Sequence, residues 1–134
     1  MTKAILVTGA SKGIGAATAR RLAKDGFDIV LHYNSDREGA AAVAQDVVAS
    51  GVEARLLQFD ISKRDATREV LENDIAENGA PYGIVLNAGV TRDAPFPALE
   101  DDDWDSVLHT NLDGFYNVIK PLLMPIIQRR QGGR

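Results

Sequence analysis

Short apolar segments alternate with longer segments of helical periodicity along the chain. Residues 4–7 form an apolar run that is too short for a helix and is followed at once by glycines. Such a run predicts a strand buried on both faces, as the strands of parallel sheets are. Residues 14–24 then carry apolar side chains at helical spacing and end before Gly26, which predicts a helix.

The same unit of strand, turn and helix recurs three more times. Further strands are predicted at residues 27–33, 54–59 and 82–86. Further helices are predicted at residues 40–49, at residues 62–79 and from Asp102 or Asp103 onward. We expect Ser62 and Asp65 to form a capping box at the third helix. Pro121 and Pro125 should kink or split the last helix.

Strands that alternate with helices of this size indicate an α/β fold, a doubly wound parallel sheet. The 134 residues suit one domain, and each unit is near the roughly 30 residues of a βαβ unit. A complete six-stranded nucleotide-binding sheet takes roughly 200 residues or more. We therefore expect residues 1–134 to form the N-terminal part of a Rossmann domain that lacks its C-terminal strands and helices. Residues 128–134 resemble the turn into a further strand.

Composition and charge narrow the possible functions. The chain has 15 Lys and Arg against 19 Asp and Glu, a net charge of −4, which gives no reason to expect nucleic-acid binding. No apolar run approaches the roughly 18 residues of a membrane span. The lack of cysteine excludes disulfides and thiolate zinc sites and fits the reducing cytoplasm. The acidic residues 100–103 favour a helix N-terminus over a metal site, so no metal is predicted.

Three glycines separate the first predicted strand from the first helix. One glycine permits a tight turn, one lets the backbone approach a pyrophosphate, and one allows close packing of helix and strand. The N-terminus of the helix then presents N–H groups and partial positive charge to phosphates. This position favours a dinucleotide over the alternative of a glycine-rich turn without ligand. The predicted cofactor loop comprises Gly9, Ala10, Ser11, Lys12, Gly13, Ile14 and Gly15.

The spacing G-x-x-x-G-x-G, preceded by Thr8, resembles the short-chain dehydrogenase/reductase family. Further family motifs follow at the expected distances: Asp60 and Ile61 after the third strand, Asn87-Ala88-Gly89 after the fourth, and Asn111 in the last helix. The resemblance implies that Asp60 hydrogen-bonds adenine beside the Ile61 backbone. It also implies that Asn87, Ala88 and Gly89 pack against the cofactor's ribose. Taken alone, each of these segments would be interpreted as turn residues.

The residues at the end of the second strand indicate whether NAD or NADP is bound. An acidic residue there would bind the 2′-hydroxyl of NAD and repel the 2′-phosphate of NADP. This strand ends in His32-Tyr33-Asn34-Ser35, with no carboxylate before Asp36. We predict that NADPH is preferred over NADH, with Lys12, Arg37, Asn34 and Ser35 around the phosphate. The alternative is that Ser35 or Asp36 caps the second helix and Arg37 is solvated.

The family resemblance implies hydride transfer by a Ser-Tyr-Lys set completed by an asparagine. Only the asparagine, Asn111, has a counterpart in these residues, so we expect the 134-residue chain alone to be inactive. Tyr116 and Lys120 have the Tyr-x-x-x-Lys spacing. They share the helix of Asn111 and follow no strand or serine, so we interpret the match as a coincidence.

The segment Thr91-Arg92-Asp93 resembles 3-oxoacyl-acyl-carrier-protein reductases and acetoacetyl-CoA reductases within that family. This resemblance implies reduction of a 3-oxoacyl thioester, on acyl-carrier protein or CoA, to the (3R)-hydroxyacyl product in fatty-acid biosynthesis. Alternatives are another ketoreductase or alcohol dehydrogenase, or a nucleotide-binding fragment without catalysis. Arg92 could meet an acidic carrier, although an ion pair with Asp93 is favoured. The last helix carries more apolar residues than one face needs, which favours a homotetramer interface. The alternative is that the expected C-terminal segments cover the surplus apolar residues.

Overall fold

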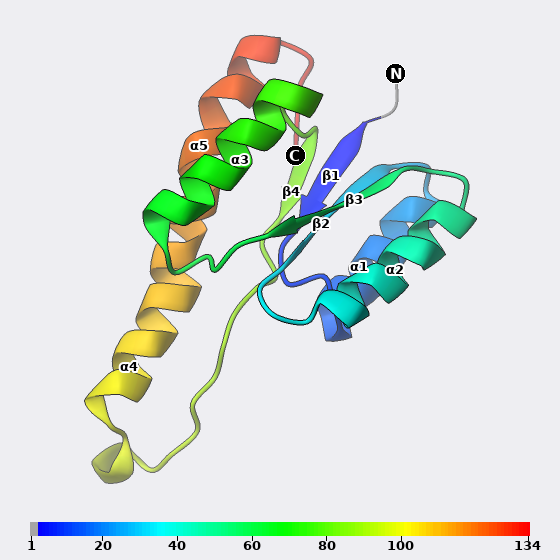
Figure 1. Ribbon diagram of the computed structural model, residues 1–134. Coiled ribbons are helices and arrows are strands. Elements are labelled where there is room, and N and C mark those ends of the chain that lie inside the picture. The colour runs from blue at the N-terminus through cyan, green and yellow to red at the C-terminus, as the bar shows by residue number, and fades with distance from the viewer. Residues whose placement is uncertain (1–2) are drawn as a thin grey trace.

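A computed structural model of the chain describes residues 3–134 as a parallel sheet covered by helices (Figure 1). The strands are β1 (Ala4–Val7), β2 (Asp28–Tyr33), β3 (Ala54–Gln58) and β4 (Gly83–Val85), in the spatial order β3-β2-β1-β4. The helices are α1 (Gly13–Lys24), α2 (Arg37–Ala49), α3 (Arg64–Asn78), α4 (Asp101–Leu108) and α5 (Gly114–Arg129). A 3-10 turn (Phe96–Ala98) precedes α4, and a π-helical turn (His109–Asp113) joins α4 to α5. This arrangement confirms the predicted α/β class, with the strand order of dinucleotide-binding sheets.

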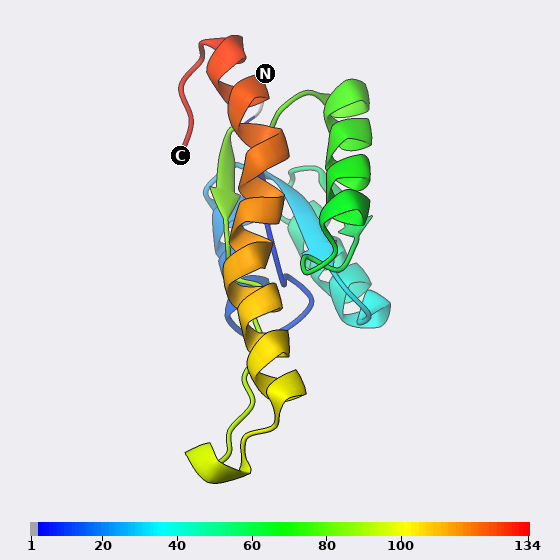
Figure 2. The same cartoon turned by 90° about the vertical axis from the view of Figure 1, so that its left-hand side faces the viewer.

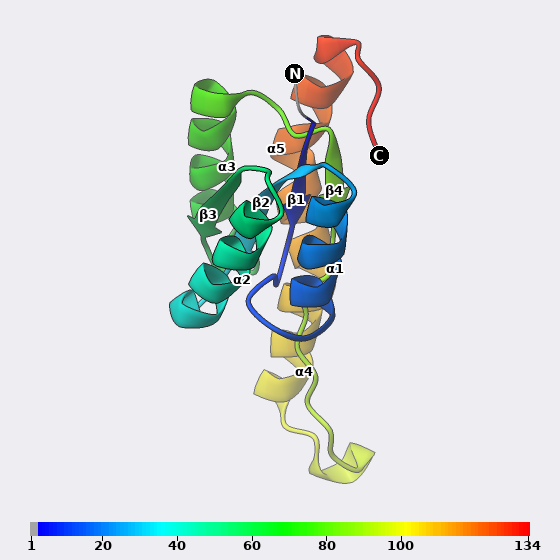
Figure 3. The same cartoon turned by 90° about the vertical axis from the view of Figure 1, so that its right-hand side faces the viewer.

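Alternate side chains of the central strands enter two separate cores, because successive residues of a strand point to opposite faces. Leu6 and Val30 pack with Leu71 of α3 and with Val118 of α5. The neighbouring strand residues pack instead against α1 and α2: Ile5, Val7, Ile29 and Leu31. Figures 2 and 3 show α3 and α5 covering one face and α1 and α2 the other.

Burial along the strands follows their position in the sheet. β2 is buried along its whole length and β1 along its last three residues, which confirms the prediction of strands enclosed on both faces. β3, at one edge, is only partly buried. At the other edge, the Arg134 N–H donates to the Tyr82 carbonyl (3.0 Å) and the Ile84 N–H donates to the Arg134 carbonyl (2.9 Å). These bonds hold the last described residue against β4.

Helix starts differ from the sequence predictions where local polar groups intervene. α2 begins at Arg37 rather than Ala40, because the Asp36 side chain accepts from the Gly39 N–H and caps the helix. The capping box at α3 was wrong: its N-cap residue is Lys63, without a side-chain cap. Ser62 donates instead to the carboxylate of Asp60, at 2.7 Å.

The last helix also departs from the prediction. α5 runs without interruption through Pro121 and Pro125, so of the two expected outcomes, a kink or a split, the split was wrong. Val118 and Leu122 are buried within this stretch, and their packing supports the helix where proline removes a hydrogen bond. The irregular turn lies earlier, at His109–Asp113. Within residues 3–134, no helix is both long and apolar enough to cross a membrane.

Candidate functional site

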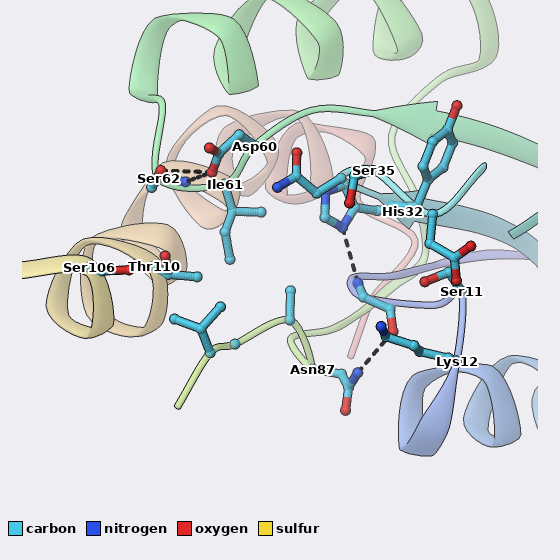
Figure 4. Close-up of a pocket in the computed structure, with 17 residues that line it drawn as sticks. Ser11, Lys12, His32, Ser35, Asp60, Ile61, Ser62, Asn87, Ser106 and Thr110 are labelled. Carbon is cyan, nitrogen blue, oxygen red and sulfur yellow. Dashed lines mark hydrogen bonds between the residues drawn. The ribbon is translucent and has the colours of Figure 1, made fainter. Parts of the chain in front are cut away.

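A cleft of about 500 Å³ lies at the edge of the sheet where the strands end. Parallel strands place their carboxyl ends, and the loops that follow, at one edge, which is where open α/β sheets bind ligands. The residues that line the cleft come from the loops after β1, β2, β3 and β4 and, on one side, from Ser106 and Thr110 of the helical segment that contains α4 (Figure 4). Its lining includes most residues predicted from the sequence: Gly9, Ser11, Lys12, Asn34, Ser35, Asp60, Ile61, Asn87, Ala88 and Gly89.

The glycine loop has the geometry that its residue types require. Gly9 and Gly13 have φ angles of +63° and +61°, which side-chain-bearing residues rarely adopt. A Cβ on Gly9 would lie 2.9 Å from the Ala88 Cα, and one on Gly15 would overlap the Gly9 carbonyl oxygen. A Cβ on Gly13 would meet nothing within 4 Å, so the backbone there is open to a ligand. Ala10 is buried beneath the loop, and Ile14 is exposed at its end.

The first turn of α1 carries free N–H groups beside this loop. Its N-cap residue, Lys12, provides no side-chain hydrogen bond to the helix. The helix N-terminus therefore keeps its partial positive charge and its donors for an anion. Lys12 is exposed and lines the cleft, so its ammonium group adds to the positive potential there.

Hydrogen bonds join the glycine loop to the loop after β4. Thr8 accepts on its Oγ1 from the backbone N–H groups of Asn87 and Ala88, both at 3.0 Å. Asn87 donates its Nδ2–H to the Gly9 carbonyl at 3.1 Å. The two motifs predicted to hold the cofactor therefore form one connected structure, 78 residues apart in sequence.

His32 supports the glycine loop from the other side, and sequence reasoning missed it. The Gly9 N–H donates to His32 Nδ1 at 3.0 Å, and His32 Nε2 lies 2.7 Å from the Phe59 carbonyl oxygen. Burial lowers the pKa of His32 below its ordinary value of 6.5, against the opposing effects of the Phe59 carbonyl and the Asp60 charge. A histidine at the end of a buried strand beside a glycine loop was the signal that could have identified it.

The loop after β2 carries the residues predicted to separate NADP from NAD. Asn34 and Ser35 are exposed and line the cleft. Asp36 also lines it, but its Oδ1 accepts from the Gly39 N–H at 3.1 Å and caps α2. This matches the alternative considered for Asp36. Arg37 is exposed at the start of α2 and is not part of the cleft lining.

The Asp60–Ile61 segment is fixed by its own turn. Asp60 accepts on Oδ1 from the backbone N–H and the hydroxyl of Ser62, at 2.9 and 2.7 Å. Ile61 is buried, and its carbonyl accepts from Asn117 Nδ2 at 2.8 Å. Figure 4 shows Asp60, Ile61 and Ser62 together on the rim of the cleft.

Asn111 lies in the π-helical turn, where one extra residue disturbs the helix. Its Nδ2 donates to the Val90 carbonyl (2.9 Å) and its Oδ1 accepts from the Val90 N–H (2.8 Å). It lies outside the lining of the main cleft and lines a smaller cavity of about 90 Å³ with Thr8 and Ala88. Its amide therefore ties this helix to the loop after β4.

Two further polar residues complete the cleft on the helix side. Ser106 and Thr110 line it, opposite Lys12 in Figure 4. Their spacing of four residues places both on one helix face. This spacing is visible in the sequence, but Ser106 and Thr110 belong to none of the family motifs and were not predicted.

Other predicted side chains lie elsewhere. Tyr116 and Lys120 line a separate cavity between α3 and α5, away from the main cleft. The predicted ion pair of Arg92 with Asp93 was wrong, because the Arg92 guanidinium lies 3.7 Å from Asp103, which α4 brings closer. Asp101, Asp102 and Asp103 occupy the first turn of α4, as predicted. Residues 3–134 contain no group of three or more His, Cys, Asp or Glu side chains placed to hold a metal ion.

The helical segment 104–127 exposes a large apolar surface, as its surplus of apolar residues predicted. Phe115 is 55% exposed and Leu112 is 65% exposed. Several large apolar side chains exposed along one helical segment are typical of an interaction site. The exposed side chains, called the apolar face below, are Trp104, Leu108, Leu112, Phe115, Tyr116, Leu123, Met124 and Ile127.

Comparison with known proteins agrees with this geometry. The family model described as short chain dehydrogenase matches residues 3–134. The chain is 58% identical, over all its 134 residues, to the 3-oxoacyl-[acyl-carrier-protein] reductase FabG of Aggregatibacter actinomycetemcomitans, and covers 55% of that protein. The chain thus spans about half the length of the curated relatives that it matches.

Solved structures of similar proteins superpose on the whole fold. A gluconate 5-dehydrogenase from Burkholderia cenocepacia, in complex with NADP and tartrate, is 35% identical with a TM-score of 0.88 over 97% of this chain and 51% of its own. A 3-oxoacyl (acyl-carrier-protein) reductase from Agrobacterium tumefaciens, with NADP bound, is 33% identical with a TM-score of 0.86 over 97% of this chain and 50% of its own. The chain belongs to the short-chain dehydrogenase family.

Proposed function

We propose that residues 1–134 form the NADPH-binding part of a reductase that acts on 3-oxoacyl thioesters. The observation that carries the proposal is the cleft at the carboxyl ends of the strands, where the glycine loop meets an α1 N-terminus without a side-chain cap. The residues present fit a dinucleotide, because Gly9 and Lys12 line the cleft beside an α1 N-terminus that has no side-chain cap. At Gly13, the first residue of α1, a Cβ would meet nothing within 4 Å.

The cofactor's parts are assigned along the cleft. The pyrophosphate binds the loop of Gly9, Ala10, Ser11, Gly13, Ile14 and Gly15 at the start of α1. The adenine contacts Asp60 and Ile61, and the ribose packs against Asn87, Ala88 and Gly89. Support for this assignment comes from the shared lining of one cleft by these three segments.

NADPH is the preferred cofactor in this proposal. The end of β2 presents Asn34 and Ser35, and the next carboxylate along the chain, Asp36, is engaged in capping α2. Lys12 and the exposed Arg37 supply positive charge for the 2′-phosphate. NADP is named in the descriptions of two similar structures, which supports the same choice.

The substrate proposed is a 3-oxoacyl group on acyl-carrier protein or CoA, reduced to the (3R)-hydroxyacyl thioester in cytoplasmic fatty-acid synthesis. The 58% identical relative is named a 3-oxoacyl-[acyl-carrier-protein] reductase, and the Thr91-Arg92-Asp93 segment supports the same branch. NADPH would supply the hydride to the carbonyl carbon. Asn111 is the one proposed catalytic residue of these 134, and its amide ties the π-helical turn to Val90.

The apolar face on α4 and α5 is proposed to pair with a second copy in a homotetramer. Its exposed aromatic and aliphatic side chains (Trp104, Leu112 and Phe115 among them) are the kind that oligomer interfaces bury.

Titration of the purified protein with NADPH and with NADH tests the cofactor assignment. We expect NADPH to bind at least about tenfold more tightly, because the 2′-phosphate adds charge-assisted hydrogen bonds. Equal affinities would reject the NADPH preference, and binding of neither would reject the site. Oxidation of NADPH with acetoacetyl thioesters, compared with sugars and simple alcohols, tests the substrate. Turnover of the sugars or alcohols alone would favour another ketoreductase.

A further inference from the structure

Hydrogen bonding defines the tautomer of His32. Its Nε2 lies 2.7 Å from the Phe59 carbonyl oxygen, which can only accept, so Nε2 must carry the proton. Its Nδ1 lies 3.0 Å from the Gly9 nitrogen, whose N–H can only donate, so Nδ1 must be unprotonated. His32 is therefore a neutral imidazole in which Nε2 donates a hydrogen bond and Nδ1 accepts one.

The Gly9 peptide is held from both sides by these contacts. His32 accepts the Gly9 N–H on its ring and the Ala10 N–H on its own carbonyl, the latter at 2.9 Å. The Gly9 carbonyl accepts from Asn87 on the opposite side. Figure 4 shows the His32 bond reaching the loop that carries Ser11 and Lys12 into the cleft. The direction of the loop's free N–H groups therefore depends on where His32 places Gly9.

We infer that neutral, Nε2-protonated His32 is a positioning residue that sets the glycine loop for the pyrophosphate of the cofactor. This inference rests on the proposed cofactor function of the cleft. His32 lines the cleft but is only 2% exposed, so we assign its effect to its hydrogen bond with Gly9. The Phe59 ring lies against it, with ring centroids 4.1 Å apart, and keeps the imidazole in one orientation.

Protonation of Nδ1 would place an N–H against the N–H of Gly9 and break the contact. The charged groups of the same cleft are Asp60 after β3, Asp36 before α2 and Lys12 before α1. Burial outweighs the Asp60 charge and lowers the pKa of His32. The folded chain therefore resists a proton that the unfolded chain accepts. The contribution of His32 to stability is complete above its ordinary pKa of 6.5 and is lost as the pH falls below it.

Two amide variants separate the tasks of the two nitrogens. His32→Asn places an amide oxygen the same number of bonds from Cβ as Nδ1, so it can still accept from Gly9 but cannot reach Phe59. His32→Gln places an amide N–H the same number of bonds from Cβ as Nε2, so it keeps the Phe59 bond and leaves the Gly9 N–H unpaired. Each variant loses one hydrogen bond, and the melting temperature measures that shared loss.

The deciding measurement is the Kd for NADPH of both variants, determined on folded protein at pH 7.5. We expect His32→Asn to stay within about threefold of the unmodified protein and His32→Gln to bind about tenfold more weakly. Equal affinities for the two variants would overturn the inference. Failure of the unmodified protein to bind NADPH would instead reject the proposed function.

A second readout needs no cofactor. The ¹⁵N chemical shifts of the His32 ring should show a protonated Nε2 and an unprotonated Nδ1 at pH 7.5. A protonated Nδ1 would overturn the inference even if the variants lost affinity. At the pH where the ring takes its second proton, NADPH should bind the unmodified protein more weakly relative to His32→Asn. Titration of the phosphate of NADPH affects both proteins equally, so it cancels in the ratio of their two Kd values. A ratio that does not change with pH would count against the inference.

Discussion

Asn87 donates its Nδ2–H to the backbone carbonyl of Gly9 at 3.1 Å, across 78 residues of sequence. The amide lies so close to the helix that a Cβ on Gly15 would meet it at 2.5 Å. The Asn87 side chain thus joins the loop after β4 to the glycine loop, together with the hydroxyl of Thr8. Both loops line the cleft assigned to the cofactor.

Replacing Asn87 with alanine should lower both stability and cofactor affinity. The variant Asn87→Ala loses one partly buried hydrogen bond, which contributes about 1 kcal/mol to the free energy of unfolding. Denaturant unfolding measures this loss, and NADPH titration should show a weaker Kd. Asn73→Ala, at an exposed position of α3, is the matched control and should leave both values unchanged. An unaltered Kd for Asn87→Ala would show that the contact does not position the loop.

Adding a methyl group at Gly15 should be more harmful than adding one at Gly114. At Gly15 the new Cβ would overlap a backbone carbonyl, that of Gly9, whereas at Gly114 it would meet only side-chain atoms of Ile61, Cδ1 at 2.7 Å and Cγ1 at 2.9 Å. Overpacking against backbone costs roughly 1–3 kcal/mol. We expect Gly15→Ala to lower the melting temperature more than Gly114→Ala. The reverse order would contradict the close packing of α1 on the glycine loop.

Removing the ammonium group of Lys12 should affect NADPH selectively. Because Lys12 lines the same cleft as Asn34 and Ser35, Lys12→Ala should raise the Kd for NADPH roughly tenfold through the loss of a charge-assisted bond to phosphate. The Kd for NADH should change little. Lys24→Ala, at the far end of the same helix, serves as the control. An equal loss for both cofactors would place Lys12 at the pyrophosphate rather than at the 2′-phosphate.

Breaking the ion pair between β3 and α3 should destabilise the sheet edge. Arg55 donates two hydrogen bonds to Asp74, at 2.7 and 2.8 Å, and Asp74 is 8% exposed. Asp74→Asn should lower the free energy of unfolding by about 2–3 kcal/mol. The loss is below that of a fully buried pair because the Arg55 side chain is 30% exposed to solvent. The exposed pair of Arg21 with Asp25 is the comparison, and Asp25→Asn should change stability by less than about 0.5 kcal/mol. Similar losses for the two variants would argue against the Arg55 pair as a stabilising contact.

A charge on the apolar face should dissociate the proposed tetramer. Phe115→Glu places a carboxylate in a surface that an interface would desolvate, which costs several kcal/mol per buried ion. Light scattering during size exclusion should show a smaller assembly. Val48→Glu, at an exposed apolar site on α2, is the control and should leave the assembly unchanged. A monomeric unmodified protein would reject the interface.

The residue pattern alone predicted the fold and the components of the cleft. Short, mostly apolar segments are typical of strands that helices cover on both faces, so the sheet could be predicted from residues 4–7 and 27–33. Glycine at positions 9, 13 and 15 indicated a tight loop, because side chains at Gly9 and Gly15 would clash and a side chain at Gly13 would strain the backbone. Helix caps were harder to predict from the sequence, because Asp36 and Ser62 could each bond to several backbone and side-chain partners.

Tertiary contacts decided what local pattern could not. His32 and Phe59 meet only because β2 and β3 pair in a particular register, and that pairing determines the protonation state of the ring. Arg92 pairs with Asp103 instead of Asp93, because the first turn of α4 lies beside the loop after β4 that carries Arg92. Packing of Val118 and Leu122 supports α5 through two prolines. The sequence by itself therefore determined the α/β sheet and the residues at its carboxyl edge. The contacts and charge states of those residues depended on segments far apart in the chain, whose distances only the folded structure defines.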